Sequence, residues 1–436
     1  MLEIHFARIE ASPGGGDDYS LIPITPTYRI IDYRPSPAPV TATNTPGRRV
    51  GSRPIASTVG NVTENLTLRI RNDVSVAQHV LNRAFQLALE WSKQFRRDMR
   101  FVARIRDPQR HTEWFEAELF GGRAELDSQN GRLLKVTWER EPYWSGAEQI
   151  LQLRNTVASG YTLGIYNHDD YRYGHDDFVI VDAPDGDVPT PARIRIRNTY
   201  ATNRLSQVKI GWYDRPHYLT LEGENSEMPV EVENDVNFSN TARGFAAQFQ
   251  WTLNQTSIVD YVGMFRVLAN GSLADSTWQI SAGYELTALQ TGKASAGTNG
   301  WTDLGLISLP PGGYVHPFRY PVRIWLTGSE EKRLDYVRFV PIDQYRRLKF
   351  IGYNCVPGAC IVDDGIRDEL VYDFNGQSLP VLDGWGDPIE IWPNALLPGT
   401  QQQILVFALE DEFGSAHPMR TADIQVTVRP RWNVVP

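Results

Sequence analysis

The stretch at 132–144 reads RLLKVTWEREPYW, and the organisation of the first domain follows from its alternation. Val136 and Trp138 face the same way in the predicted strand, because successive side chains of a strand point to opposite sides. We therefore expect Trp138 in a core. A proline then ends the strand, and Tyr143 and Trp144 follow it directly. These two rings are expected to cap the end of a sheet or to contact a neighbouring subunit.

One helix is predicted upstream of this strand, at about 75–97. Ser75 and Gln78 match a capping box, and Asp73 places a negative charge near the positive end of the helix. The apolar positions step by three or four residues, as expected for a helix packed on a sheet. They form one stripe: Val76, Val80, Ala84, Leu87, Trp91 and Phe95.

Strands are predicted on both sides of this helix, so residues 1–157 read as an α+β domain. Within it, residues 12–60 are rich in Pro and Thr and hold too few apolar positions for a compact core. This segment is predicted to be an extended arm or long loop that orders against a neighbour.

The rest of the chain reads as strands and turns, with 35 Gly and 28 Pro in 436 residues. Residues 158–190 are dominated by Gly, Asp, Asn and Pro and are expected to form a linker. A β-sandwich is expected from 191–230 together with 347–436, interrupted by a jelly-roll-like domain, similar to carbohydrate-binding modules, at 231–346. The predicted fold class is mainly β.

Charge and hydropathy disfavour several classes of protein. Lys and Arg number 43 against 52 Asp and Glu, which gives a formal net charge of −9. Tight nucleic-acid binding is not expected, because duplex binding draws on Lys and Arg that neutralise phosphates. The start of the chain lacks the pattern of a signal peptide, and no run approaches the ~20 apolar residues of a membrane helix. We expect a protein made in the cytoplasm, without a membrane span.

Two HDD triplets form the sharpest candidate for a metal site. Imidazole and carboxylate groups suit Zn or Mn, and carboxylates suit Ca. The spacing is neither that of an EF-hand loop nor that of an HExxH helix. In a segment rich in Gly and Pro, such residues also serve as solvated turn formers, so both interpretations stay open. The candidate ligands are His168, Asp169, Asp170, His175, Asp176 and Asp177.

The two cysteines, Cys355 and Cys360, flank the turn VPGA, which could bring them together in a local disulfide. Two cysteines are too few for a disulfide scaffold. Close by, Asp363 and Asp364 suggest a carboxylate pair such as a glycosidase uses, with acid and base about 5–9.5 Å apart. Asp-Asp-Gly is equally an ordinary turn. Because no nucleophile or phosphate-loop motif appears, we predict no catalytic residues, no cofactor and no enzyme activity.

Aromatic residues in the inner β region offer a binding alternative, a glycan site within 230–345. Sandwich domains that bind sugars stack them on exposed rings, whereas large aromatics are more often buried. The residues available for stacking are Trp212, Tyr213, Tyr218, Trp278, Trp301 and Trp325.

Three stretches together resemble phage tail proteins of the distal-tail and baseplate type. They are RLLKVTWEREPYW, which closes the helix-bearing domain, PIEIWPNALLPGTQQQILVFAL at 388–409, and ADIQVTVRPRW at 422–432. In that family a sheet-plus-helix domain forms a ring around the tail channel, and a β-sandwich projects outward. The resemblance covers 60–150 and 385–436, and the middle of the chain by architecture. The long 10–60 segment and the large 190–350 region depart from the pattern.

The resemblance implies a structural virion protein, a distal tail protein or a neighbouring minor tail component at the tip or baseplate of the tail. It implies a homo-oligomeric ring that contacts the tail tube and other tail proteins, located in the virion. The alternatives are a carbohydrate-binding adhesin that recognises host-surface glycans and a glycoside hydrolase.

Overall fold

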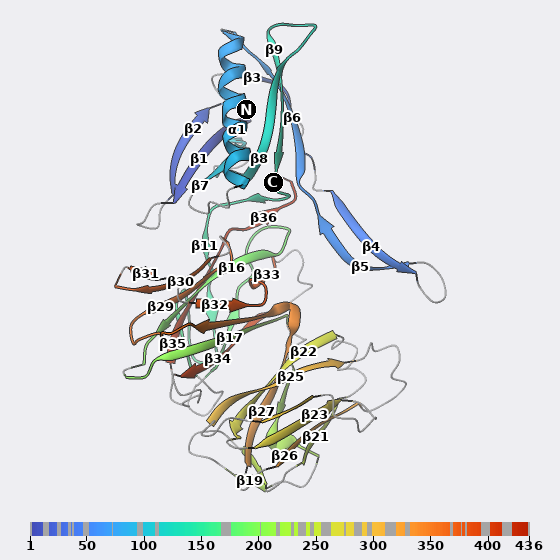
Figure 1. The fold of residues 1–436 in the computed structure, drawn as a ribbon, viewed down its shortest axis with the longest axis vertical. Coiled ribbons are helices and arrows are strands. Elements are labelled where there is room, and N and C mark those ends of the chain that lie inside the picture. Colours follow the sequence, from blue (N-terminus) through green and yellow to red (C-terminus); the bar gives the residue numbers. More distant parts are fainter. Residues whose placement is uncertain are drawn as a thin grey trace. The chain divides into compact units, whose positions relative to one another are not determined.

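The fold was obtained as a computed structural model, shown in Figure 1. It describes residues 2–434 except for the segments that follow. These are 12–16, 24–27, 34–35, 37–38, 47–51, 72, 94–98, 110–112, 167–175, 201, 215–218, 228–230, 234–240, 245–247, 254–262, 274–275, 283–289, 294–298, 310–319, 328–331, 367–368, 376, 380–381, 394–401 and 412–420. Within the described part the chain is mainly β with one α-helix, which confirms the predicted fold class.

The chain divides into two compact units. The first comprises Met1–Glu148 together with two short returning segments, Asp185–Val188 and Arg429–Pro436. The second comprises Gln149–Pro184 and Pro189–Val428. The first unit therefore contains the C-terminal end of the chain, which the sequence did not predict.

The first unit is built on one antiparallel sheet with its strands in the order β2, β1, β7, β8, β9, β6, β3. Two short strands, β10 and β36, pair with each other, and β10 also pairs with β8. The strands are β1 (Glu3–Ala11), β2 (Asp17–Pro23), β3 (Arg29–Tyr33), β6 (Val62–Arg69), β7 (Met99–Arg106), β8 (Phe115–Leu126), β9 (Leu133–Arg140), β10 (Trp144–Ser145) and β36 (Arg431–Trp432).

The helix α1 (Val74–Lys93) packs on this sheet against β8 and, to a lesser extent, β7 and β9 (Figure 1). Its cap differs from the prediction. The carboxylate of Asp73, rather than the side chain of Ser75, accepts hydrogen bonds from the backbone N–H groups of Ser75 at 3.1 Å and Val76 at 3.4 Å. Asp73 therefore satisfies N–H groups at the start of α1 that have no partner within the helix.

The buried stripe of α1 matches the predicted one in part. Ala84 is buried and Leu87 packs against the core, whereas Val76 and Val80 are 57% and 40% exposed. Phe95 and the side chain of Trp91 lie outside the described residues. The buried residues are Ala77, Leu81, Ala84, Phe85 and Ala88. Three of these five are alanines, whose small side chains let the helix approach the sheet closely. At Gly122 on β8, an added Cβ would lie 2.8 Å from a ring carbon of Phe85. Close packing thus outweighs the greater hydrophobicity of the valines.

The N-terminal segment expected as an arm contributes to the sheet and also forms a separate hairpin. β2 pairs with β1, and β3 pairs with β6. β4 (Val40–Pro46) and β5 (Ser52–Val59) pair with each other and with no other described strand (Figure 1). A backbone hydrogen bond of 2.9 Å from Gly60 to Pro39 closes the base of this hairpin.

The second unit contains a sandwich of two antiparallel sheets around a shared apolar core. The first sheet consists of β11 (Gln149–Ile150), β14 (Leu163–Tyr166), β16 (Thr190–Asn198), β29 (Cys360–Asp364), β30 (Glu369–Phe374), β31 (Gln377–Leu379), β33 (Glu390–Ile391) and β35 (Thr421–Val428). The second consists of β12 (Leu153–Arg154), β13 (Ser159–Gly160), β15 (Phe178–Val181), β17 (Leu205–Asp214), β28 (Tyr345–Phe350), β32 (Leu382–Trp385) and β34 (Gln403–Asp411).

The predicted linker at 158–190 carries strands of this sandwich. β14 pairs with β35 in one sheet, and β15 pairs with β34 in the other. β15 has four residues, FVIV, and follows a run of Asp, Gly and His. Because that composition is typical of turns, the sequence did not predict a strand here.

Two further sheets with their own apolar core lie in sequence between β17 and β28, which are paired neighbours. One consists of β18 (Leu219–Glu222), β19 (Glu231–Glu233), β20 (Thr241–Gly244), β22 (Gly263–Ser272), β25 (Asn299–Leu309) and β27 (Lys332–Pro341). The other consists of β21 (Gln248–Leu253), β23 (Thr277–Ala282), β24 (Gln290–Lys293) and β26 (Tyr320–Thr327). Short 3-10 turns follow β18 at Gly223–Asn225 and β27 at Ile342–Gln344. Among the described residues no helix is long and apolar enough to cross a membrane.

Candidate functional site

A densely connected group of polar residues lies in the first unit where β9 ends. Along β9 the side chains alternate, and Val136, Trp138 and Arg140 all lie on the buried side. Along the neighbouring β6, Glu64 likewise shares the buried side with Leu66. The register of the two antiparallel strands brings the acid and the base together, because Val62 lies opposite Arg140 and Glu64 opposite Trp138.

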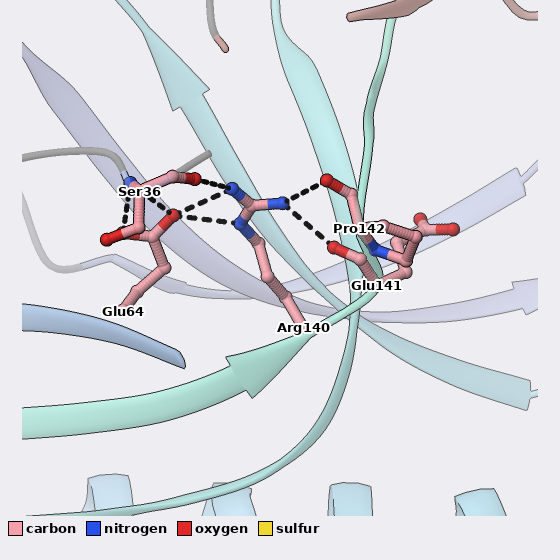
Figure 2. A network of polar contacts seen from close by, with 5 residues as sticks. All are labelled: Ser36, Glu64, Arg140, Glu141 and Pro142. Carbon is pink, nitrogen blue, oxygen red and sulfur yellow. Dashed lines mark hydrogen bonds and ion pairs between the residues drawn. The ribbon is translucent and has the colours of Figure 1, made fainter. Parts of the chain in front are cut away.

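Arg140 uses all five of its N–H groups in this arrangement, as Figure 2 shows. Its Nε and Nη2 donate to one oxygen of Glu64 at 3.0 and 2.8 Å. Nη2 also donates to the carbonyl of Ser36 at 3.1 Å. Nη1 donates to the carbonyls of Glu141 and Pro142 at 2.8 and 3.0 Å. We call these five residues the Arg140 cluster.

The cluster fixes two pieces of chain that have no regular strand pairing there. The backbone N–H of Ser36 donates to both carboxylate oxygens of Glu64, at 3.3 and 3.2 Å. Because the carbonyl of Ser36 accepts from Arg140, both polar backbone groups of this residue are bound, and they hold the N-terminal segment in place. On the other side, the carbonyls of Glu141 and Pro142 are held by Arg140 directly after β9 ends. Charged hydrogen bonds of this kind are roughly twice as strong as neutral ones.

Aromatic rings enclose the cluster. The guanidinium of Arg140 lies 4.5 Å from the ring centre of Trp144, a cation–π contact. Tyr33 at the end of β3 stacks on Trp138 with ring centres 5.8 Å apart. Burial and the nearby Glu64 carboxylate raise the pKa of Tyr33, so this phenol stays neutral. The rings and the ion pair together join β3, β6 and β9 at one end of the sheet.

The charges of Arg140 and Glu64 are compensated by each other and by their hydrogen bonds, without help from solvent. Neither side chain of the Arg140–Glu64 pair is exposed to solvent. Burial raises the pKa of the Glu64 carboxyl, and the charge and hydrogen bonds of Arg140 counteract that rise. A buried charge of this kind is tolerated because its partner and its hydrogen bonds compensate for lost hydration. The cluster is therefore suited to hold chain segments in place, and it presents no group to a substrate.

The two predicted contact residues of this stretch differ in exposure. Trp144 is 1% exposed and lies opposite Trp432 in the β10–β36 pairing, inside its own unit. Tyr143 is half-buried, with the guanidinium of Arg431 5.6 Å from its ring centre. Trp144 therefore caps the end of the sheet and has no surface left for another subunit. Tyr143 retains exposed surface, and its contact with a subunit stays a prediction.

The predicted metal ligands fall largely outside the described residues, which exclude His168, Asp169, Asp170 and His175. The remaining two are engaged in structural contacts. Asp176 accepts hydrogen bonds from the backbone N–H and hydroxyl of Thr156, at 2.9 and 2.6 Å. Asp177 accepts one from the hydroxyl of Tyr336 at 2.7 Å and forms an ion pair with Arg338. Within the described residues no group of three or more His, Cys, Asp or Glu could hold a metal ion.

The cysteines do not pair with each other, and the neighbouring carboxylates are bound to arginines. Cys355 and Cys360 are both buried free thiols, so no disulfide joins them. Asp363 pairs with Arg346 at 3.0 Å, and Asp364 pairs with Arg193 at 2.9 Å. Asp364 thus joins β29 to its neighbour β16, and Asp363 joins β29 to β28 of the opposite sheet. Most of the aromatic residues considered for sugar stacking are core residues: Trp212, Tyr213, Trp278 and Trp301 are buried, Trp325 is half-buried, and Tyr218 lies outside the described residues.

One carboxyl pair escaped the sequence analysis. Glu118 on β8 and Glu141 after β9 lie side by side, since the Glu118 N–H donates to the Glu141 carboxylate at 2.8 Å. Burial and the charge of Glu141 raise the pKa of Glu118 to about 7. In the second unit, burial and the charge of Glu224 similarly raise the pKa of Glu222 to about 7. No local pattern reveals such groups, because their environment comes from residues distant in sequence.

No family model matches the chain, and no curated protein matches its sequence. Among solved structures, the fold is similar to the SPP1 Dit protein (gp 19.1), described as a paradigm of the hub adsorption apparatus in phages that infect Gram-positive bacteria. The identity is 8% and the TM-score 0.34, over 97% of this chain and 98% of that one. It is also similar to a chain of the activated phage p2 baseplate with Ca, at 9% identity and a TM-score of 0.25, over 75% of this chain and 98% of that one. At such values the matches assign neither family nor function.

Proposed function

We propose that the chain is a structural virion protein of a phage tail, a distal-tail or minor tail component that assembles into a ring or hub at the tail tip. The sequence resemblance supports this assignment through the segments that close the helix-bearing domain and the chain. The sandwich and the two inserted sheets would project from the hub. Other proteins of the tail tube and baseplate would be its partners, and its place would be the virion.

The observation that carries the proposal is the β4–β5 hairpin. Its strands pair with each other and with no other described strand. An isolated two-stranded hairpin is marginally stable in water, and its unpaired edges invite pairing with another chain. The Arg140 cluster holds the chain at Ser36, a few residues before the hairpin begins. A firmly anchored hairpin with open edges is suited to contact a neighbouring subunit.

The carboxylates that were candidates for catalysis or metal binding also favour a structural role. Asp363, Asp364 and Asp177 all lie in ion pairs with arginines of other elements, so these carboxylates serve the fold. The net charge of −9 suits a channel wall that DNA passes without counterion-release binding. The proposal assigns the chain no catalytic step and no cofactor.

Excision of the hairpin tests the proposal. The Gly60 N–H and the Pro39 carbonyl are 2.9 Å apart, so residues 40–59 can be replaced by a short Gly-Ser turn without straining the base. The shortened chain should keep its melting temperature and its circular dichroism but lose assembly, measured as mass by light scattering. A second variant, Tyr143→Ala, should weaken assembly less. Assembly that persists without the hairpin would contradict the role given to it.

A further inference from the structure

A polar cavity of about 350 Å³ lies on the second unit, over the outer face of the sheet that contains β16, β29, β30 and β35. The face is defined by alternation along β16. Ile194 and Ile196 belong to the sandwich core, so Arg195 and Arg197 between and beyond them face outward and are exposed. Cavities of this volume lie within the range that holds small ligands, about 300–1,000 Å³.

The register of the sheet places hydrogen-bond donors and acceptors side by side in this cavity. Arg197 lies directly between Asp423 on β35 and Cys360 on β29. Cys360 in turn lies opposite Asp373 on β30. In the next row, Arg195 lies opposite Gln425. Because adjacent strands are about 4.8 Å apart, the row from Asp423 to Asp373 spans roughly 14 Å.

The charged side chains of this cavity have no partner among the described residues. In the described part of the chain, none of Arg195, Arg197, Asp373, Asp423 and Gln425 has a side-chain hydrogen bond or ion pair. Arg197 and Asp423 do not form an ion pair although they are direct cross-strand neighbours.

An outward arginine beside the cavity does form such a pair. Arg193, two residues earlier on the same face of β16, pairs with Asp364 at 2.9 Å. Two consecutive outward arginines beside two open carboxylates therefore distinguish the cavity from the sheet around it.

The charges of the cavity decide what kind of ligand it suits. Two arginines and two aspartates give no net charge, so attraction of an anion to the guanidinium groups is opposed by the carboxylates. A hydroxyl group both donates and accepts hydrogen bonds. A neutral polyhydroxyl ligand can therefore donate to Asp373 and Asp423 while it accepts from Arg195 and Arg197.

An exposed aromatic residue also precedes one of the lining residues in sequence. Tyr161 is 60% exposed and precedes Thr162, one of the lining residues. Exposed aromatic rings offer an apolar face beside a polar edge, which suits the mixed surface of a sugar. We propose that this cavity is a binding site for a neutral saccharide, independent of the hub-assembly role.

Ligand-observed NMR of the full-length protein tests the proposal. The probes are the methyl glycosides of glucose, galactose, mannose and N-acetylglucosamine and their neutral disaccharides, with inorganic phosphate as the anionic comparison. At least one saccharide should show saturation transfer at millimolar concentration, and phosphate should not displace it. Absence of transfer to every saccharide, or competition by phosphate, would overturn the proposal.

Variants locate the binding. Arg197→Ala and Asp423→Asn should each weaken saccharide binding about tenfold, because each removes a charged hydrogen bond. Arg197 is exposed and Asp423 is half-buried, and neither side chain pairs with another described residue, so the melting temperature should stay unchanged. Arg154→Ala is the matched control, since it removes an exposed arginine of the same unit that pairs with Asp182. Binding of wild-type strength in both cavity variants would place the ligand elsewhere and overturn the assignment. All variants should assemble normally, which separates this test from that of the hub.

Discussion

Arg140 and Glu64 form an ion pair of 2.8 Å in which neither side chain is exposed, at the end of the sheet in the first unit. The pair holds Ser36 on one side and the chain after β9 on the other. Through these contacts it determines where the N-terminal segment leaves the sheet.

Removal of one partner of this pair should be strongly destabilising. Arg140→Ala leaves the Glu64 carboxylate buried without compensation, and we expect a loss of about 3–5 kcal/mol in the free energy of unfolding. Urea unfolding measures it. Arg123→Ala is the control, because its ion pair with Glu125 is exposed and should change stability little. A loss in Arg140→Ala no larger than in the control would show that the cluster does not hold the fold.

Replacement of both partners should recover much of that stability. In Arg140→Met combined with Glu64→Leu, no buried charge remains, and apolar side chains of similar volume often replace a buried pair at little cost. The double variant should unfold at a higher urea concentration than Arg140→Ala. However, it lacks the hydrogen bonds to Ser36, so proteolysis near residue 36 should be faster than in the wild type. Equal proteolysis would argue against the anchoring role.

The stability of the first unit should depend on pH through Glu118. Its pKa is about 7 in the folded chain against an ordinary value of 4.5. A carboxyl whose pKa is raised by folding contributes stability that is fully present below about pH 4.5 and is lost as the pH rises through about 7. Glu118→Gln should therefore flatten the fall in melting temperature between pH 5 and 8. Glu125→Gln, at an exposed position, should leave the fall unchanged.

Both cysteines should behave as protected thiols. Burial raises the pKa of Cys355 to about 12, and both side chains are buried. A thiol reagent at pH 8 should react slowly with the native protein and rapidly with two thiols per chain in denaturant, with or without reductant. If the denatured, unreduced chain showed no reactive thiol, a disulfide would join the two residues after all.

Close packing of the helix on the sheet should make Gly122 sensitive to substitution. A Cβ at this position would lie 2.7 Å from the Thr137 carbonyl and 2.8 Å from a ring carbon of Phe85. Gly122→Ala should cost about 1–3 kcal/mol through overpacking, measured by urea unfolding. Gly131→Ala is a matched control, because its added Cβ would meet no atom within 4 Å. Similar stability of the two variants would contradict the close approach.

The sequence predicted the features that depend on local pattern. Alternation in RLLKVTWER placed Trp138 in the core, and the same parity includes Arg140, a charge at a core-facing position. A charged residue on the core-facing side of the strand was the feature of the sequence that indicated a buried ion pair. Its partner Glu64 could not be assigned, because the pairing depends on the register of β6 and β9, which are separated by more than 60 residues.

Features that depend on tertiary packing escaped prediction. Periodicity placed Val76, Val80 and Ala84 on one buried stripe of α1, but of these three only Ala84 is buried, because small alanines allow a closer approach to the sheet and shift the buried face away from the valines. The pairing of Trp144 with Trp432 brings the end of the chain back to the first unit, and no local pattern indicates it. Likewise, the alternation around Arg195 and Arg197 predicts a strand but does not indicate that the two side chains line a cavity.

Negative-stain imaging of the purified full-length protein at several concentrations shows whether this chain assembles through its first unit into a tail hub. Closed rings with a central hole are expected, at a mass that is a multiple of 49.4 kDa. Rings should be absent from the variant that lacks residues 40–59. Single particles of 49.4 kDa at every concentration would rule out self-assembly into a hub.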